Sequence, residues 1–405
     1  MDPGVSRGTI PVAVGLLALT LSCSGRPERR APGSGPAAGA RGSGARRMAE
    51  RLETITRRLD PTRNMFINSS RAEYLRAGIA KRPGQRMSLL PLVADELLKA
   101  GRTEEAIATA QSLLHPSSAD AIEAPPAVET HEFLGLAYMR LGEQENCVAH
   151  HGIDSCLVPI RGSGRHTLPR GSRGAIEEFS RVLEERPDDL GARWLMNIAY
   201  MTLGEYPDKV PRRWLIPPAT FAAEHDIQRF YDVAPKLGLS ISGHAGGAIM
   251  EDFDGDGFLD VMFSSMGVRD PLRYFHNDGD GTFSDRTEAA GLTGEVGGLN
   301  IVHADYDNDG HPDVLILRGG WMKIGGRYPN SLLRNNGDNT FEDVTEEAGI
   351  LSFPPPQTGA WGDYDNDGWI DLFIGNESTP DDPHPCELYR NNRDGTFSDR
   401  SIELG

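Results

Sequence analysis

The sequence predicts a multidomain protein in which an α-helical repeat array is followed by an all-β region of propeller blades. Two observations predict this fold class. Before residue 205, apolar residues recur with the period of a helix, with glycine between segments and proline after them. After residue 229, a Phe-x-Asp motif returns at steps of 53, 58 and 56 residues, with short apolar segments in each interval. A chain of 405 residues is also too long for one small core.

Residues 1–22 have the pattern of an export signal. An apolar run from Ile10 to Leu21 is too short to span a bilayer, and it ends in a Thr-Leu-Ser-Cys sequence that resembles the lipobox of bacterial lipoproteins. We therefore predict lipid attachment at Cys23, with simple signal cleavage and a non-exported protein as the alternatives. Residues 23–47 are rich in Gly, Pro, Ala, Ser and Arg without periodicity, which predicts a disordered linker.

Residues 48–204 predict a helical domain. Segments 97–114, 133–187 and 194–204 share a pattern of small and aromatic residues at fixed offsets, with Gly between helices and Pro after them. This pattern resembles the tetratricopeptide repeat, whose period is about 34 residues. Four prolines exclude a further regular helix, so residues 205–225 are predicted to form a stiff connector.

The stretch 143–171 interrupts the helical pattern where a tight turn is expected. It carries five side chains that can bind metal or form disulfides, namely Cys147, His150, His151, Cys156 and His166. In an exported protein, Cys147 and Cys156 are expected to form a disulfide. A Zn²⁺ or copper site made with the histidines is a second interpretation, and free thiols are a third. The Cys-x-x-His-His run lacks the second cysteine of a c-type haem attachment site.

One nine-residue pattern, Asp-x-Asp-x-Asp-Gly-x-x-Asp, occurs at residues 252–260 (loop 1), 305–313 (loop 2) and 363–371 (loop 3). Four carboxylates this close together repel one another unless a cation lies among them. Hard oxygen donors with Gly at position 6 suit Ca²⁺, and position 7 adds its backbone carbonyl. The predicted ligands are Asp252, Asp254, Asp256, Phe258 and Asp260 in loop 1, Asp305, Asp307, Asp309, His311 and Asp313 in loop 2, and Asp363, Asp365, Asp367, Trp369 and Asp371 in loop 3.

Each repeat has one half of fixed length and one of variable length. The Phe-x-Asp motif precedes the first Asp of the next loop by 22 residues each time, whereas the distance from a loop to the following motif varies. Position 12 is Phe263, Ile316 or Ile374 rather than the bidentate Glu of an EF-hand, so each loop is expected to precede a buried strand. Hairpins at 277–282 and 336–340 complete units of about four short strands, which is typical of propeller blades.

These loops, and the Gly-Asp-Gly-Thr-Phe hairpin with its following Asp-x-Thr-x-x-Ala-Gly-Leu, resemble the FG-GAP/VCBS repeats. The layout of the chain resembles the cartilage-acidic-protein-like (ASPIC/UnbV) family. The resemblance covers residues 230–405 and implies a Ca²⁺-stabilised propeller of about seven blades, used in adhesion or recognition, and a C-terminal domain that this sequence lacks. The sequence supplies about three blades, whereas a closed propeller needs about four or more. We therefore interpret the β region as an incomplete propeller, truncated from a longer protein.

The net charge and the sequence motifs limit the classes of partner that the protein can have. The net charge is −18 and no basic stripe with interleaved aromatics is present, so nucleic acid is not expected as a partner. We predict an exported, non-enzymatic protein of the cell envelope, periplasmic or on the outer surface, that binds three Ca²⁺ ions. A protein or glycan ligand is expected at the blade loops and a protein partner on the helical array. The membrane is expected to be reached only through a lipid anchor.

An enzyme is the alternative function. Propellers also host hydrolases and oxidoreductases, and catalysis would then use His303, His311, or a Zn²⁺ or copper ion at the Cys/His insertion. The sequence has no Gly-x-Ser-x-Gly, phosphate-loop or dinucleotide-binding pattern. This favours a binding protein.

Overall fold

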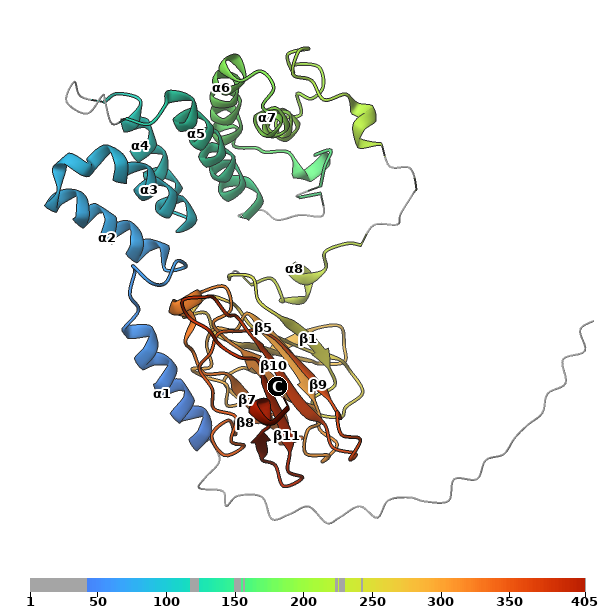
Figure 1. The fold of residues 1–405 in the computed structure, drawn as a ribbon. Coiled ribbons are helices and arrows are strands. Elements are labelled where there is room, and N and C mark those ends of the chain that lie inside the picture. Colours follow the sequence, from blue (N-terminus) through green and yellow to red (C-terminus); the bar gives the residue numbers. More distant parts are fainter. Residues whose placement is uncertain are drawn as a thin grey trace, which may run out of the picture. The chain divides into compact units, whose positions relative to one another are not determined.

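The computed structural model describes residues 42–116, 124–148, 154–155, 157–222, 225, 230–241 and 243–404. The longer helices come first in the chain and the strands follow (Figure 1). The predicted export signal and Cys23 lie outside the described residues. None of the described helices combines the length and the apolar character needed to cross a membrane.

The helical region extends from α1 to α7. Its helices are α1 (Ser43–Arg57), α2 (Asn68–Lys81), α3 (Arg86–Lys99), α4 (Thr103–Leu113), α5 (Ala127–Gly142), α6 (Arg170–Glu185) and α7 (Leu190–Thr202). Helix α1 begins at Ser43, inside the stretch predicted to be a disordered linker. Its buried Met48 and Leu52 pack with Met322 and Tyr328 of the β region. This helix is therefore ordered by burial of its apolar face, which the composition of the linker does not reveal.

From α2 to α7, each helix packs against the next one along the chain. The closest approach is between α5 and α6, which lie side by side in Figure 1. A Cβ atom on Gly135 would lie 2.6 Å from the ring of Phe179, and one on Gly174 would lie 2.6 Å from the ring of Tyr138. Consecutive packing of this kind is expected in a helical repeat array, and the tetratricopeptide assignment stays a prediction.

The described part of the segment predicted as a stiff connector, residues 205–225, packs on the helices that precede it. Trp214 is buried in the same apolar core as α6 and α7. On α7, the side-chain amide of Asn197 donates to the carbonyl of Trp214 (2.9 Å) and accepts from the N–H of Ile216 (3.1 Å). The described part of this segment has no α-helix, as its prolines predict, and only a short 3₁₀ turn at Pro218–Phe221. It packs on the helices because its tryptophan completes their core.

The insertion between α5 and α6 is closed by one buried side chain. It starts with a π-helical turn at Glu143–Val148 and contains a 3₁₀ turn at Gly162–Gly164. The Asn146 side chain donates to the carbonyl of Gly142 (2.9 Å) and accepts from the N–H groups of Thr167 (2.8 Å) and Leu168 (2.9 Å). The two ends of the insertion are thereby held together.

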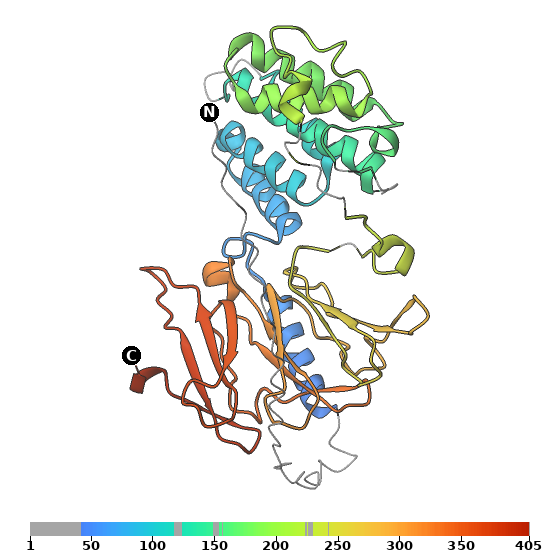
Figure 2. The same ribbon diagram turned by 90° about the vertical axis from the view of Figure 1, so that its right-hand side faces the viewer.

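The described part of the β region contains three four-stranded antiparallel sheets, in each of which every strand pairs with the next one along the chain (Figure 2). Sheet 1 consists of β1 (Ala248–Glu251), β2 (Asp260–Phe263), β3 (Arg273–Asn277) and β4 (Phe283–Asp285). Sheet 2 consists of β5 (Asn300–Ala304), β6 (Asp313–Leu317), β7 (Ser331–Asn335) and β8 (Phe341–Asp343). Sheet 3 consists of β9 (Pro356–Gly362), β10 (Asp371–Asn376), β11 (Glu387–Asn391) and β12 (Phe397–Asp399). Two short helices, α8 (Ala234–Leu237) and α9 (Ser401–Leu404), flank the sheets in sequence.

Neighbouring sheets share apolar cores. Met262 and Ile316 belong to the core between sheets 1 and 2, and Leu315 and Ile374 belong to the core between sheets 2 and 3. Strand β6 is buried along its whole length, because sheet 2 is covered on both faces. The predicted order of helices followed by four-stranded sheets is confirmed. The predicted propeller is not, because the sheets of the described chain do not close into a ring.

Each sheet takes its fourth strand from the Phe-to-Phe unit that follows its other three strands. Phe283, Phe341 and Phe397 are the first residues of β4, β8 and β12. The N–H of Phe341 donates to the carbonyl of Ala290 (2.9 Å), at the turn that follows β4. In the copies that begin at Phe283 and Phe341, the 22-residue half therefore consists of the fourth strand, a tight turn and the first strand of the next sheet. Its constant length places every Asp loop at the same point of its sheet.

Candidate metal centre in the hairpin loops

Each Asp loop connects the first and second strands of its sheet. Position 9 is the first residue of the second strand in all three, so the fourth carboxylate enters the sheet while the other three remain in the loop. The strand that follows loop 2 is buried throughout, as the sequence predicts, whereas the strands that follow loops 1 and 3 are buried at about half of their positions.

Backbone N–H groups wrap each loop around its position-1 carboxylate. In loop 2, Asp305 accepts from the N–H groups of Asp309 (3.1 Å) and Gly310 (2.9 Å). Asp309 in turn accepts from the N–H of His311 (2.9 Å). Loops 1 and 3 repeat these three bonds. Gly310 has a φ of 92°, which explains the need for glycine at position 6. The loop geometry is thus set by local hydrogen bonds.

The position-9 carboxylates are the buried members of the loops. Asp260, Asp313 and Asp371 are 0%, 0% and 2% exposed. Each accepts from the N–H of the position-2 residue, at 3.3, 3.2 and 3.1 Å respectively. Each also accepts at 2.8 Å from the N–H of an asparagine that ends the third strand of the same sheet.

This asparagine was not among the residues that the sequence singled out. The side-chain amide of Asn335 donates to the carbonyl of Phe253 in loop 1 (2.8 Å), and that of Asn391 donates to the carbonyl of Tyr306 in loop 2 (2.8 Å). Each amide thus connects one sheet to the loop of the preceding sheet. The available signal was an Asn two residues before the first glycine or arginine of every hairpin turn, with Asn277 as the third copy.

Within each loop, three carboxylates place an oxygen within 4.8 Å of one another. The clusters are Asp252, Asp254 and Asp256 in loop 1, Asp305, Asp307 and Asp313 in loop 2, and Asp363, Asp365 and Asp371 in loop 3. In loop 1, Asp254 and Asp260 also converge with His276. The structure therefore brings the predicted carboxylate ligands of each loop together, with the remaining aspartates beside them in the same loop.

Loop 2 has the least compensated charge. Burial, together with the nearby Asp307 and Asp309 carboxylates, raises the pKa of Asp313 to about 9. Burial and the neighbouring carboxylates also raise the pKa of Asp307 to about 6. A cation among these oxygens would relieve both the repulsion and the loss of hydration. An all-oxygen, clustered and partly buried donor set fits Ca²⁺.

Basic side chains contact the carboxylates of the other two loops. In loop 1, Nδ1 of His276 lies 3.1 Å from Asp260 Oδ1. In loop 3, Arg390 donates through Nε to Asp365 Oδ2 (2.6 Å) and through Nη2 to Asp367 Oδ2 (2.7 Å). Arg393 also donates to Asp367 Oδ2 (2.8 Å), and it is the main reason that the pKa of Asp367 is lowered. A positive charge is thus already placed among the carboxylates of loop 3.

The Cys/His insertion brings together two of its five predicted residues. Cys147 Sγ lies 3.5 Å from Nε2 of His166, and Nδ1 of His166 lies 2.9 Å from Ser172 Oγ. Burial lowers the pKa of His166, which favours the neutral imidazole. His150, His151 and Cys156 lie outside the described residues. The disulfide, metal and thiol interpretations therefore stay predictions.

The two histidines considered for catalysis make structural contacts. Nε2 of His303 lies 3.1 Å from Glu251 Oε2, a polar contact that joins β5 to β1. The imidazole of His311 lies over the backbone of Gly337 in the β7–β8 hairpin, where a Cβ atom would lie 2.4 Å from the ring.

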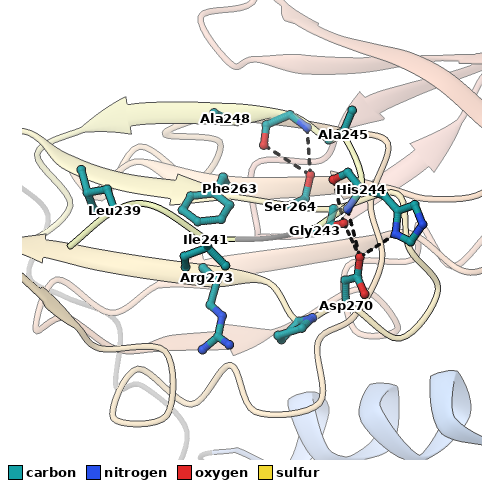
Figure 3. A pocket seen from close by; sticks show the side chains of 14 residues that line it. Leu239, Ile241, Gly243, His244, Ala245, Ala248, Phe263, Ser264, Asp270 and Arg273 are labelled. Carbon is teal, nitrogen blue, oxygen red and sulfur yellow. Dashed lines mark hydrogen bonds and ion pairs between the residues drawn. The ribbon is translucent and has the colours of Figure 1, made fainter. Parts of the chain in front are cut away.

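A pocket of about 380 Å³ lies beside sheet 1, away from the Asp loops (Figure 3). His244 and Asp270 lie at one end, with the histidine Nδ1 2.9 Å from Asp270 Oδ2. The hydroxyl of Ser265 donates to the same oxygen (2.7 Å). In a nucleophile–base relay the imidazole lies between the hydroxyl and the acid, so this arrangement differs from a catalytic triad.

Comparison with known proteins agrees with the repeat pattern. Residues 252–316 and 322–374 match the FG-GAP-like repeat. Human cartilage acidic protein 1 is 29% identical over 189 residues, which is 45% of this chain and 26% of that protein. The chain thus spans about a quarter of the length of this relative. The matches support an FG-GAP-like repeat assignment for the β region.

Proposed function

We propose that the β region is a Ca²⁺-binding repeat module of an exported recognition protein, with one ion in each Asp loop. The observation that carries the proposal is the threefold recurrence of one hairpin loop in which three carboxylates converge within 4.8 Å. Turns that are merely polar need neither this convergence nor the buried aspartate at the start of the second strand.

The residues that would hold the ion connect different parts of the hairpin. Positions 1, 3 and 5 and the carbonyl of position 7 belong to the loop, whereas position 9 belongs to the second strand. Bound Ca²⁺ would supply positive charge among these oxygens and join loop and strand. An ion at ten times its dissociation constant adds about 1.4 kcal/mol to the stability of the folded state at each site.

Recognition of a protein or glycan is the function that this architecture supports best. Loops on a rigid sheet scaffold commonly carry binding residues, and consecutively packed helices present a further surface for a protein partner. Export agrees with a loop set suited to the millimolar Ca²⁺ outside cells, because open ligand sets bind at roughly 10⁻⁴–10⁻³ M.

Calorimetric titration of the purified, chelator-treated chain with Ca²⁺ and then Mg²⁺ tests the proposal. We expect Ca²⁺ to bind more tightly than Mg²⁺ and to raise the melting temperature. Asp307→Asn should weaken one site, whereas Asp381→Asn, which removes an exposed carboxylate outside the loops, should leave binding unchanged. Absence of both heat and thermal stabilisation with Ca²⁺ would refute the proposed function.

A further inference from the structure

In each sheet, one residue precedes the asparagine that ends the third strand. The three sheets differ in the residue of the fourth strand that faces it. In each sheet the residue before the asparagine is basic, and it pairs across the antiparallel ladder with a residue of the fourth strand. The pairs are His276–Ser284 in sheet 1, Arg334–Glu342 in sheet 2 and Arg390–Ser398 in sheet 3. Cross-strand neighbours in such pairs are close enough for their side chains to interact.

In sheet 2, the fourth strand engages the arginine. Nη2 of Arg334 donates to Glu342 Oε2 at 3.1 Å, and the side chain of Glu342 is only 11% exposed. The carboxylate on β8 therefore competes with loop 2 for this guanidinium. Loop 2 keeps its cluster of carboxylates for another cation.

In sheet 3, the fourth strand offers no such partner. Ser398 stands where sheet 2 has Glu342, and its hydroxyl donates to the side chain of Asn392. The guanidinium of Arg390 instead bridges Asp365 and Asp367 in loop 3. The fourth-strand residue thus decides where the arginine goes: Glu342 holds Arg334 within sheet 2, whereas Ser398 leaves Arg390 to contact loop 3.

A second arginine is placed in loop 3 by an unusual backbone conformation. Arg393 has a φ of 68°, in the left-handed region that L side chains rarely adopt. The corresponding positions of the other hairpins are Gly279 and Gly337, with φ values of 73° and 71°. The backbone conformation is kept while glycine is replaced by arginine. Its guanidinium contacts Asp367.

We propose that Arg390 and Arg393 form an internal cation that occupies loop 3 in place of Ca²⁺, so that loop 3 binds Ca²⁺ more weakly than loop 2. This inference rests on the proposed Ca²⁺ binding and adds an order to it. Loop 2 fills before loop 3, which fills only at Ca²⁺ concentrations that displace the guanidinium groups. At low Ca²⁺, the arginines keep loop 3 folded, whereas loop 2 retains its unbalanced charge.

Calorimetric titration of the full, chelator-treated chain tests this order. The double variant Arg390→Gln/Arg393→Gly should tighten the weakest site at least tenfold. Glycine at position 393 suits the positive φ, so folding should be retained. Adding Asp365→Asn to this variant should abolish the gain, which assigns it to loop 3.

Exchanging the outer-strand residues gives matched controls. Ser398→Glu should draw Arg390 away from loop 3 and tighten the weakest site. Glu342→Ser should free Arg334 and weaken the loop 2 site, and Arg334→Gln should reverse that loss. Opposite shifts from the two exchanges are the signature of the proposed competition.

A measurement without Ca²⁺ separates this inference from the proposed function. In chelator, Arg390→Gln/Arg393→Gly should lower the melting temperature, and millimolar Ca²⁺ should restore it. If the wild type and the Arg390→Gln/Arg393→Gly variant bind Ca²⁺ with the same dissociation constants, the inference is overturned and the proposed function stands. Absence of Ca²⁺ binding in every variant would overturn both the inference and the proposed function. A lower melting temperature of Arg390→Gln/Arg393→Gly in chelator would then show that the two arginines only stabilise the fold.

Discussion

Most ion pairs of the described helices lie at the surface, with the half-buried pair of Arg71 and Glu96 as an exception, whereas the β region has a charged pair fully inside its sheets. Arg102 joins Glu105 and Glu73 across the exposed faces of α2 and α4. By contrast, Arg318 and Glu295 of the β region are 2% and 0% exposed, with Nη2 and Oε2 2.5 Å apart. Surface pairs contribute little to folding, but an unpaired buried charge is costly. The comparison indicates that cations and protons should affect the sheets and leave the helices nearly unchanged.

The largest effect is expected from breaking the buried pair. Arg318→Met leaves Glu295 buried without its partner and removes the donors to the carbonyls of Val296 and Pro329. We expect a loss of about 3–5 kcal/mol in the free energy of unfolding. Hydrogen exchange should localise the loss to peptides from sheet 2. The double variant with Glu295→Met should recover part of the stability, and equal losses in the single and double variants would contradict a penalty from the unpaired charge.

The second effect tests the connection between neighbouring sheets. Asn335→Ala leaves the carbonyls of Phe253 and Pro312 without their amide donor, which we expect to cost about 2 kcal/mol. Asn277→Ala is the matched control, because its amide donates to Leu259 within sheet 1. Chemical denaturation should show a clearly smaller loss for the control. Equal losses would mean that the bond between sheets adds nothing.

The third effect is a pH dependence of the Ca²⁺-free β region. The pKa of Asp307 is raised to about 6 and that of Asp313 to about 9, so the folded state binds more protons than the unfolded chain above about pH 4. The stability contributed by these groups is therefore present below pH 4 and is lost as the pH rises to about 6 and then about 9. Melting temperatures in chelator should fall over this range, and Ca²⁺ should flatten the fall. A fall of the same size with saturating Ca²⁺ would argue against Ca²⁺ at loop 2.

The smallest effect should come from the surface pairs of the helices. Arg102→Ala removes the ion pairs to Glu105 and Glu73 but leaves no charge buried without a partner. The melting temperature should change by no more than the error of the measurement, and the difference should vanish at high salt. A loss as large as that of Arg318→Met would contradict the contrast between the two regions.

The features that depend on local spacing could be predicted from the sequence. Carboxylates at positions 1, 3, 5 and 9 with glycine at position 6 specify a loop closed by its own N–H groups. The constant 22-residue step specifies where that loop stands, because it contains one strand, one turn and the next strand. These features were predictable because the partners lie within a few residues of one another.

The tertiary structure decided what depends on distant partners. Whether an arginine enters a metal loop depends on the opposite strand, as Arg334 with Glu342 and Arg390 with Ser398 show. Trp214 turns a predicted connector into part of a core, and the first helix starts within a predicted linker because its apolar face is buried against the sheets. Composition and periodicity describe the chain's own tendencies. Burial and charge compensation depend on which segments meet, and only the folded chain brings those segments together.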